Sequence, residues 1–152
     1  MAPSEQTLLV GRSLIRIAAD IEIYRSNLNQ AKALRNAFWP EDLASIVADC
    51  AKSLSDAGDR LLVKAIGYGA VLPATLDEVE EISSVKRTEP STQPTEMTLQ
   101  VDQDQRQIAE DVRTLFQVLA SLLSSEDRQD LQSVLDHATR CSAALRDLDQ
   151  GA

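Results

Sequence analysis

The sequence has 152 residues, a formal net charge of −9 and a single histidine, and 43% of its residues are hydrophobic. This length and apolar content suit one domain with a substantial core. The acidic balance argues against the usual basic surface of a nucleic-acid-binding protein, and one histidine excludes most histidine-rich metal sites. Few glycines and aromatic residues, together with many Ala and Leu residues, favour an all-α fold.

The first predicted helix runs from Ser4 to about Arg35. Asp20 and the other charged residues of this segment lie off its apolar face. A break follows at residues 36–40, where Phe38 and Trp39 are expected either to cap the core or to anchor a subunit contact. The apolar face is inferred from hydrophobic residues that recur at alternating spacings of four and three: Val10, Leu14, Ile17, Ile21, Tyr24, Leu28 and Ala31.

The second predicted helix runs from Pro40 to about Ile66. Gly58 lies inside it and indicates either a close helix contact or a functional bend, whereas Gly67 and Gly69 are expected to end it. Its predicted core face consists of Leu43, Ile46 or Val47, Cys50, Leu54, Ala57, Leu61 and Ala65.

A long connection, residues 67–95, follows the second helix. Thr75 and Glu78 form a capping-box pattern, which predicts a short helix from there to about Ser83. Residues 84–95 are expected to be an exposed loop. A connection of this length within a compact domain needs a geometric role, such as crossing from one end of the fold to the other.

Two further helices are predicted after the loop, separated by a turn and N-cap at residues 124–127. The tight connections within each helix pair predict two antiparallel hairpins. One long crossover between the hairpins predicts a ferritin-like four-helix bundle with a short extra helix. Residues 1–152 are expected to form this bundle as a single domain. The expected inner faces are Val101, Ile108, Val112, Leu115, Leu119 and Leu122, interrupted by Gln105, and then Leu131, Val134, Leu135, Ala138, Cys141, Leu145 and Leu148.

The predicted interior lacks the side chains of a di-iron site. Val134 stands three residues before His137, so the Glu-x-x-His motif fails, and no Asp or Glu lies on the predicted core faces. We expect His137 to be a boundary residue; a pH switch, a lone ligand or a Cys141–His137 nucleophile are the alternatives. The acidic cluster Asp77, Glu78, Glu80 and Glu81 is expected to be a solvated face, with a cation-binding rim as its alternative.

Compartment is inferred from the N-terminus, the apolar runs and the cysteines. Residues 1–7 lack the pattern of a secretory signal, and no apolar run approaches the roughly 20 residues that span a bilayer. Cys50 and Cys141 lie 91 residues apart and match no metal-binding spacing. Buried free thiols are expected, because both cysteines fall on apolar faces. A disulfide is the alternative, and it requires that their helices touch and is disfavoured in a reducing compartment. We therefore expect a soluble cytoplasmic protein without membrane association.

The second helix and the crossover carry a family resemblance. Residues 58–67 (GDRLLVKAIG), 72–79 (LPATLDEV) and 82–85 (ISSV) resemble the DNA-protection-during-starvation (Dps) family of ferritin-like proteins. The resemblance covers nearly the whole chain in helix order and length. It implies a hollow homo-oligomer, a dodecamer in most members, that oxidises ferrous iron with peroxide and stores it. The implied ferroxidase site lies between subunits rather than inside the bundle.

This sequence departs from the family pattern at the implied iron ligands. Asn27 and Pro40 stand in the regions of the two histidines, and the acidic pair corresponds to Ser55 and Asp59, so only Asp59 keeps a carboxylate. One carboxylate without imidazoles holds iron poorly in competition with water. We therefore expect Asp59 to form a surface or interface ion pair. Residues 1–11 contain no Lys or Arg, so we do not expect the basic tail that some members use to bind DNA.

Three hypotheses follow. The first is an oligomeric shell or scaffold subunit with no catalytic, cofactor-binding or metal-binding residues, although residual iron binding stays open. The second is an active iron-storage ferroxidase with unconventional ligands, and the third is a helical module that binds another protein. The residues at positions 27, 40, 55 and 59 favour the first hypothesis over the second.

Overall fold

The computed structural model describes residues 4–89 and 93–150, with side chains up to Asp147. All regular structure in these ranges is helical, which confirms the all-α prediction for this part of the chain. The helices are α1 (Glu5–Gln30), α2 (Lys32–Phe38), α3 (Glu41–Gly67), α4 (Leu76–Ile82), α5 (Pro94–Val118) and α6 (Ser125–Gln150).

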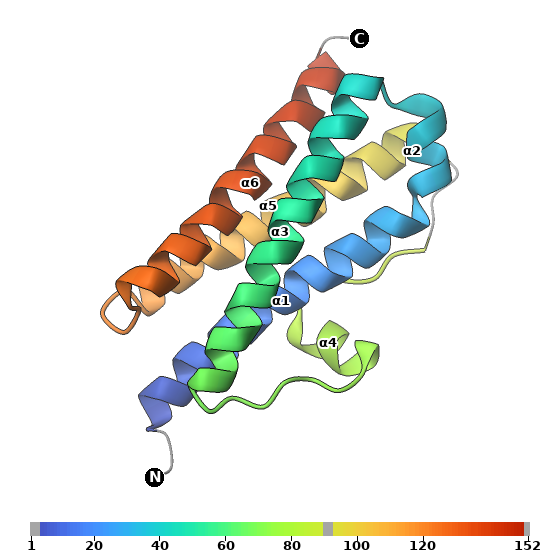
Figure 1. The fold of residues 1–152 in the computed structure, drawn as a ribbon. Helices are drawn as coiled ribbons and strands as arrows, with labels where there is room; N and C mark the ends of the chain where they lie inside the picture. Colours follow the sequence, from blue (N-terminus) through green and yellow to red (C-terminus); the bar gives the residue numbers. More distant parts are fainter. Residues whose placement is uncertain (1–3, 90–92, 151–152) are drawn as a thin grey trace.

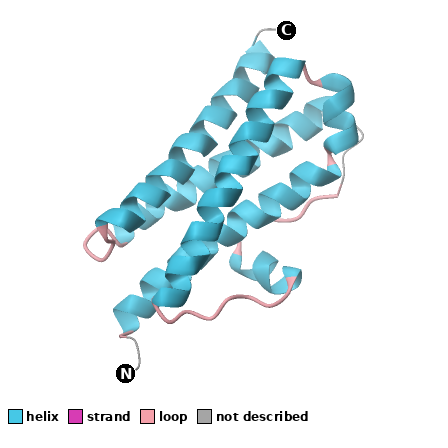
Figure 2. Cartoon of the chain, viewed as in Figure 1, coloured by secondary structure: helices cyan, strands magenta, loops and turns pink. Residues whose placement is uncertain are grey.

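The four long helices lie side by side and enclose one core (Figure 1). Helix α3 packs against α1 and α6, and α5 packs against α6 and α1, so each long helix has two long neighbours. Helices α1 and α6 run in one direction and α3 and α5 in the other (Figure 1). The long connection after α3 contains α4 and then runs to the opposite end of the helices, where α5 begins (Figure 2). This is the crossing role that its length predicts.

The predicted apolar faces form the core. Among the described side chains, Leu14, Tyr24, Leu54, Ile108 and Leu131 are fully buried. Burial of each such side chain stabilises the fold by roughly 1.5–3 kcal/mol relative to exposure. Leu148, which was expected on the inner face of the last helix, lies outside the residues whose side chains are described.

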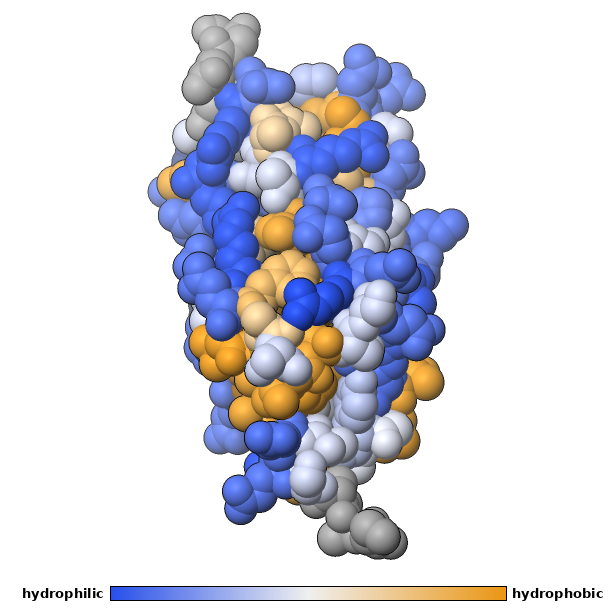
Figure 3. Space-filling view, turned by 90° about the vertical axis from the view of Figure 1, so that its left-hand side faces the viewer, coloured by the Kyte–Doolittle hydropathy of each residue, from blue (hydrophilic) through white to orange (hydrophobic). Residues whose placement is uncertain are grey.

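Trp39 caps one end of the core, which is the first of its two expected roles. Its ring is buried, and its indole Nε1 donates a hydrogen bond to Thr98 Oγ1 at 2.9 Å. Phe38 is 59% exposed and takes no part in this cap. Other large hydrophobic side chains are also exposed, and Figure 3 shows a face where hydrophobic patches alternate with hydrophilic surface.

Two predicted helix boundaries are wrong. The first helix does not continue to Arg35, because the chain turns at Ala31 and begins α2 at Lys32. After this turn the buried Arg35 lies over the Trp39 ring, 6.0 Å from its centroid, in a cation–π contact. The loop predicted for residues 84–95 ends early, because Pro94 starts α5; residues 90–92 lie outside the described part.

The predicted stop and start signals are confirmed. At the end of α3, Gly69 has φ 86°, and Ala70 N donates to Ala65 O at 3.0 Å, the bonding of a Schellman cap. At the start of α4, Glu78 N donates to Thr75 Oγ1 at 3.2 Å, and the Glu78 carboxylate accepts from Ala74 N at 2.7 Å. Ser124 Oγ similarly accepts from Asp127 N before α6.

Gly11 brings the start of α1 close to the end of α3 and the residues after it. A Cβ atom on Gly11 would lie 3.0 Å from Ala70 Cβ and 3.3 Å from Ala65 O, atoms that cannot rotate away. A Cβ atom on Gly58 would lie 3.5 Å from Ile21 Cδ1, an ordinary van der Waals distance, so this buried glycine is not required by a close helix contact. Gly11 therefore sets the spacing at its end of the helix pair.

We expect Gly11→Val to lower the free energy of unfolding by about 2 kcal/mol, because the added atoms force the two segments apart. Chemical denaturation measures this change. Gly67→Val is the matched control, since a Cβ there meets nothing within 4 Å; it should change the unfolding free energy by less than about 0.5 kcal/mol. Equal effects of the two substitutions would contradict this account of the contact.

Candidate functional site

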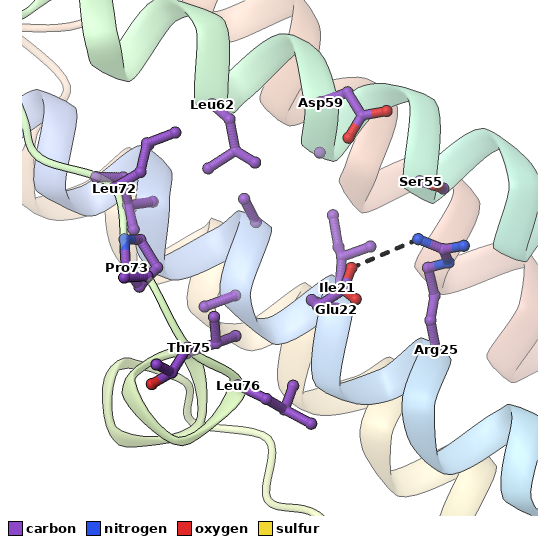
Figure 4. A pocket seen from close by; sticks show the side chains of 16 residues that line it. Ile21, Glu22, Arg25, Ser55, Asp59, Leu62, Leu72, Pro73, Thr75 and Leu76 are labelled. Carbon is purple, nitrogen blue, oxygen red and sulfur yellow. Dashed lines mark hydrogen bonds and ion pairs between the residues drawn. The ribbon is translucent and has the colours of Figure 1, made fainter.

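A groove with a volume of about 350 Å³ lies between α1, α3 and α4 (Figure 4). Its floor comes from small and apolar residues of α1 and α3, and its outer wall comes from the segment before α4 and from α4 itself. The apolar lining consists of Ile15, Ala18, Ala19, Ile21, Gly58, Leu62, Leu72, Pro73, Ala74, Leu76 and Val79. The polar lining consists of Glu22, Arg25, Ser55, Asp59 and Thr75.

The position of α4 creates this groove. The short helix packs mainly against α1 and buries none of its own residues. Leu76 is 41% exposed and Ile82 is 37% exposed, so apolar side chains of α4 are only partly covered. Because α4 stands away from α3, the small residues Ala18 and Gly58 form the floor between them.

The polar edge of the groove carries both signs of charge. Arg25 Nη1 lies 3.4 Å from Glu22 Oε2, and Arg25 extends from α1 towards Ser55 on α3 (Figure 4). Both partners of this pair are exposed, so it contributes little to stability. Asp59 is exposed, and within the described residues no ion pair involves it, so the expected pair is not formed inside one chain.

The four positions that the resemblance compares with iron ligands do not come together. Ser55 and Asp59 both line the groove, but Asn27 and Pro40 do not. Asn27 is buried, and its Nδ2 donates to Lys86 O at 2.9 Å and to Asp104 Oδ2 at 3.1 Å. Its Oδ1 accepts from Thr88 N at 3.0 Å. The Asn27 side chain is therefore fully used in holding the crossover.

Four carboxyl groups are buried, although none of them lies on a predicted apolar face. Asp20, Asp102, Asp104 and Asp127 are all at most 5% exposed. The sequence pattern did not show this burial, because it only placed these residues off the apolar faces. The structure instead supplies polar partners from distant segments; for example, Ser142 on α6 donates to Asp102 on α5.

Asp20 has the most perturbed environment of these groups. Its Oδ1 accepts from Ser83 Oγ and from Ser84 N, both at 2.8 Å. Burial, together with the neighbouring Asp111 on α5, raises the pKa of Asp20 to about 8. Asp20 is thus protonated at neutral pH and can donate that proton to Asp111, which avoids two adjacent negative charges.

Arg16 covers the solvent-facing side of the Asp20–Asp111 pair. Its Nη2 donates to Ser84 Oγ at 2.7 Å, and its Nε lies 4.0 Å from Asp111 Oδ2. A second buried acid, Asp104, has its pKa raised by burial to about 6, although hydrogen bonds from Asn27 and Gln100 oppose the shift. These groups hold helices together, and across residues 4–89 and 93–150 no three His, Cys, Asp or Glu side chains converge as metal ligands.

The other residues singled out in the sequence are His137, Cys141 and the acidic cluster of α4. His137 is half-buried, and no hydrogen bond joins it to Cys141 within the described part of the chain. The neighbours of Cys141 are Cys50 and Tyr24, so the Cys141–His137 nucleophile is not supported. In the acidic cluster, Arg87 pairs with Asp77 and Glu80, and therefore the cluster is partly neutralised rather than free for cations.

Comparison with known proteins adds no relative. No protein-family model matches the chain, and no curated protein matches its sequence. Among the described residues, no helix has the length and apolar character needed to cross a membrane.

The raised pKa of Asp20 leads to a pH prediction. The unfolded carboxyl titrates near pH 4 and the folded one near pH 8, so folding favours the protonated form. The contribution of Asp20 to stability is complete below about pH 4 and declines as the pH rises towards 8. We expect Asp20→Asn to be more stable than the natural protein by roughly 2–5 kcal/mol at pH 9, with the difference vanishing near pH 4.

Urea denaturation across this pH range measures the difference. Glu22→Gln removes an exposed carboxylate on the same helix and serves as the control; its stability difference should stay nearly constant with pH. A stability gap for Asp20→Asn that does not change between pH 4 and pH 9 would show that folding leaves the pKa of Asp20 unshifted.

Proposed function

We propose that this chain is a subunit of a homo-oligomer of the Dps-like, ferritin-like kind, a shell or scaffold subunit without a conventional ferroxidase centre. The observation that carries the proposal is the partly covered apolar groove between α1, α3 and α4, whose edge holds charges of both signs. A second copy of the chain is the occupant that we assign to it. The ferritin-like assignment itself is part of this proposal.

The helix arrangement supports the ferritin-like part. Two helix hairpins, α1–α3 and α5–α6, are joined by one connection that crosses the full length of the molecule (Figure 1). One long crossover distinguishes ferritin-like folds from simple up-and-down bundles. The short helix α4 within that crossover agrees with the resemblance in residues 72–85.

The chemistry of the groove supports the loss of the ferroxidase centre. At the implied ligand positions Ser55 replaces a carboxylate and Asp59 is the single acid. The side chain of Asn27 is occupied by hydrogen bonds to the backbone of Lys86 and Thr88. The guanidinium of Arg25 extends towards Ser55 (Figure 4). Glu22 also lines the groove, but Arg25 pairs with it, and a fixed positive charge beside these carboxylates disfavours a ferrous ion there.

The groove's charges support a second copy as occupant. Copies of a chain with net charge −9 repel one another at long range, so an attractive contact must come from apolar area and local pairing. In a twofold contact the same patch meets itself, so Arg25 of one copy can face Asp59 of the other. The exposed Leu76 would be covered in such a contact, together with the apolar groove wall.

Leu76→Glu should disrupt this assembly. The new carboxylate would be buried at the contact, and we expect the concentration for half-assembly to rise at least about tenfold. Light scattering coupled to size-exclusion chromatography measures the mass of each form. Because Leu76 is already 41% exposed in the isolated chain, helix content and thermal stability should be little changed.

Leu99→Glu provides the matched control, since Leu99 is 51% exposed on α5 and lies outside the groove lining. This variant should keep the mass of the natural protein. A natural protein that stays monomeric at micromolar concentration would refute the shell proposal. It would leave the groove to a different protein or to a small apolar ligand.

A second measurement separates the proposed subunit from an active iron-storage enzyme. With ferrous iron and hydrogen peroxide, the assembled protein should produce ferric iron no faster than the solution without protein, because Asp59 alone cannot hold the metal. Ultraviolet absorbance follows the ferric product. A rate several-fold above the blank that is lost in Asp59→Asn would establish the ferroxidase hypothesis instead.

A further inference from the structure

The two cysteines of the chain lie in the same part of the core. Cys50 on α3 is 1% exposed and Cys141 on α6 is 0% exposed, and both are free thiols in the structure. Helices α3 and α6 are direct neighbours. The condition that the sequence sets for a disulfide, contact between the two helices, is therefore met.

The ion pairs between α3 and α6 show that the two cysteines are opposite each other. Lys64 on α3 lies 3.6 Å from Asp127 on α6, measured from Nζ to Oδ1. Cys50 is fourteen residues before Lys64, and Cys141 is fourteen residues after Asp127. Since antiparallel helices advance by equal rises in opposite directions, these steps lead to the same level of the helix pair.

A second contact confirms this register. Arg60 Nε lies 3.3 Å from Asp130 Oδ1, and the steps from these residues to Cys50 and Cys141 are ten and eleven residues. At the level so defined, the two thiols lie close enough for each to shift the pKa of the other. The hydroxyl of Tyr24, a buried residue of α1, lies beside them.

The two thiols differ in acidity. A hydrogen bond from the Cys141 thiol lowers the pKa of Cys50 to about 7, and the nearby Arg140 acts in the same direction against the effect of burial. The same hydrogen bond and burial raise the pKa of Cys141. Cys50 is therefore the thiol that ionises near neutral pH, and the thiolate is the reactive form.

We propose that Cys50 and Cys141 form a redox pair that a hydroperoxide converts to an intrachain disulfide joining α3 to α6. The Cys50 thiolate attacks one peroxide oxygen and becomes a sulfenic acid, while the other oxygen leaves and is protonated. Cys141 Sγ then attacks Cys50 Sγ, hydroxide leaves, and the proton of Cys141 converts it to water. Two thiols and one hydrogen peroxide thus give one disulfide and two water molecules.

Thiol counting on the full-length natural protein tests the pair. Reduced protein is freed of reductant, exposed to hydrogen peroxide while folded, then denatured and alkylated for intact-mass analysis. We expect a form that has lost the mass of two hydrogen atoms and takes up no alkylating reagent, and that regains two reactive thiols after reduction. A protease digest should yield the peptide pair joined through Cys50 and Cys141.

The disulfide should also change thermal stability. A cross-link between residues 91 apart restricts the unfolded chain strongly, so the oxidised form should unfold roughly 10 °C higher than the reduced form. Cys50→Ala and Cys141→Ala should each lose this shift and keep one thiol that can be alkylated. If either variant fails to fold, the alkylation of the natural protein decides alone.

Three results would overturn the proposal. They are two thiols that remain open to alkylation after peroxide treatment, sulfinic or sulfonic acid at Cys50 without a cross-link, and a disulfide that joins two chains. Each is distinguished by mass from the intrachain bond. Because the measurement follows chemistry inside one chain, its outcome does not depend on whether the chain assembles.

Discussion

The buried carboxyl of Asp20 is the contact on which the arrangement of the crossover depends. It binds the two serines at which α4 ends and the chain turns away, Ser83 and Ser84. Seven residues later on α1, Asn27 binds the backbone at Lys86 and Thr88. These two side chains lay the connection along α1 and direct it towards the start of α5. They also place α4 beside α1 rather than α3, and the groove follows from that placement.

The helices were predictable because their signals are local. Apolar residues at helical spacing and caps such as Thr75 with Glu78 depend on neighbours within one segment. The turn at Ala31 was not predicted, because the apolar spacing of four and three continues through Ala31 and gives no local sign of a break. The burial of Asp20 was not predicted either. Its main partners are 63 and 64 residues away, so nothing near it in the sequence shows that burial is tolerated.

The candidate site was predictable only in part. The resemblance drew attention to Asn27, Pro40, Ser55 and Asp59, yet only the latter two share the groove. Helix periodicity places residues on faces, but it does not show which faces meet, and α4 completes the groove from a segment with no buried residue. The proximity of Cys50 and Cys141 was not predictable for the same reason. Each lies on a predicted core face, but their alignment requires the register of α3 against α6, which their ion pairs reveal.

The lack of buried residues in α4 gives the two sides of the groove different mechanical properties. Opening a segment costs free energy in proportion to the apolar surface and hydrogen bonds that it exposes, so α4 belongs to the regions that open most readily. The opposite side consists of buried residues such as Gly58 and Ile21, inside the contact of α1 and α3. A molecule entering the groove would meet a rigid base and an adaptable wall. Such a wall can adjust to partners of somewhat different shape while the main core keeps its packing.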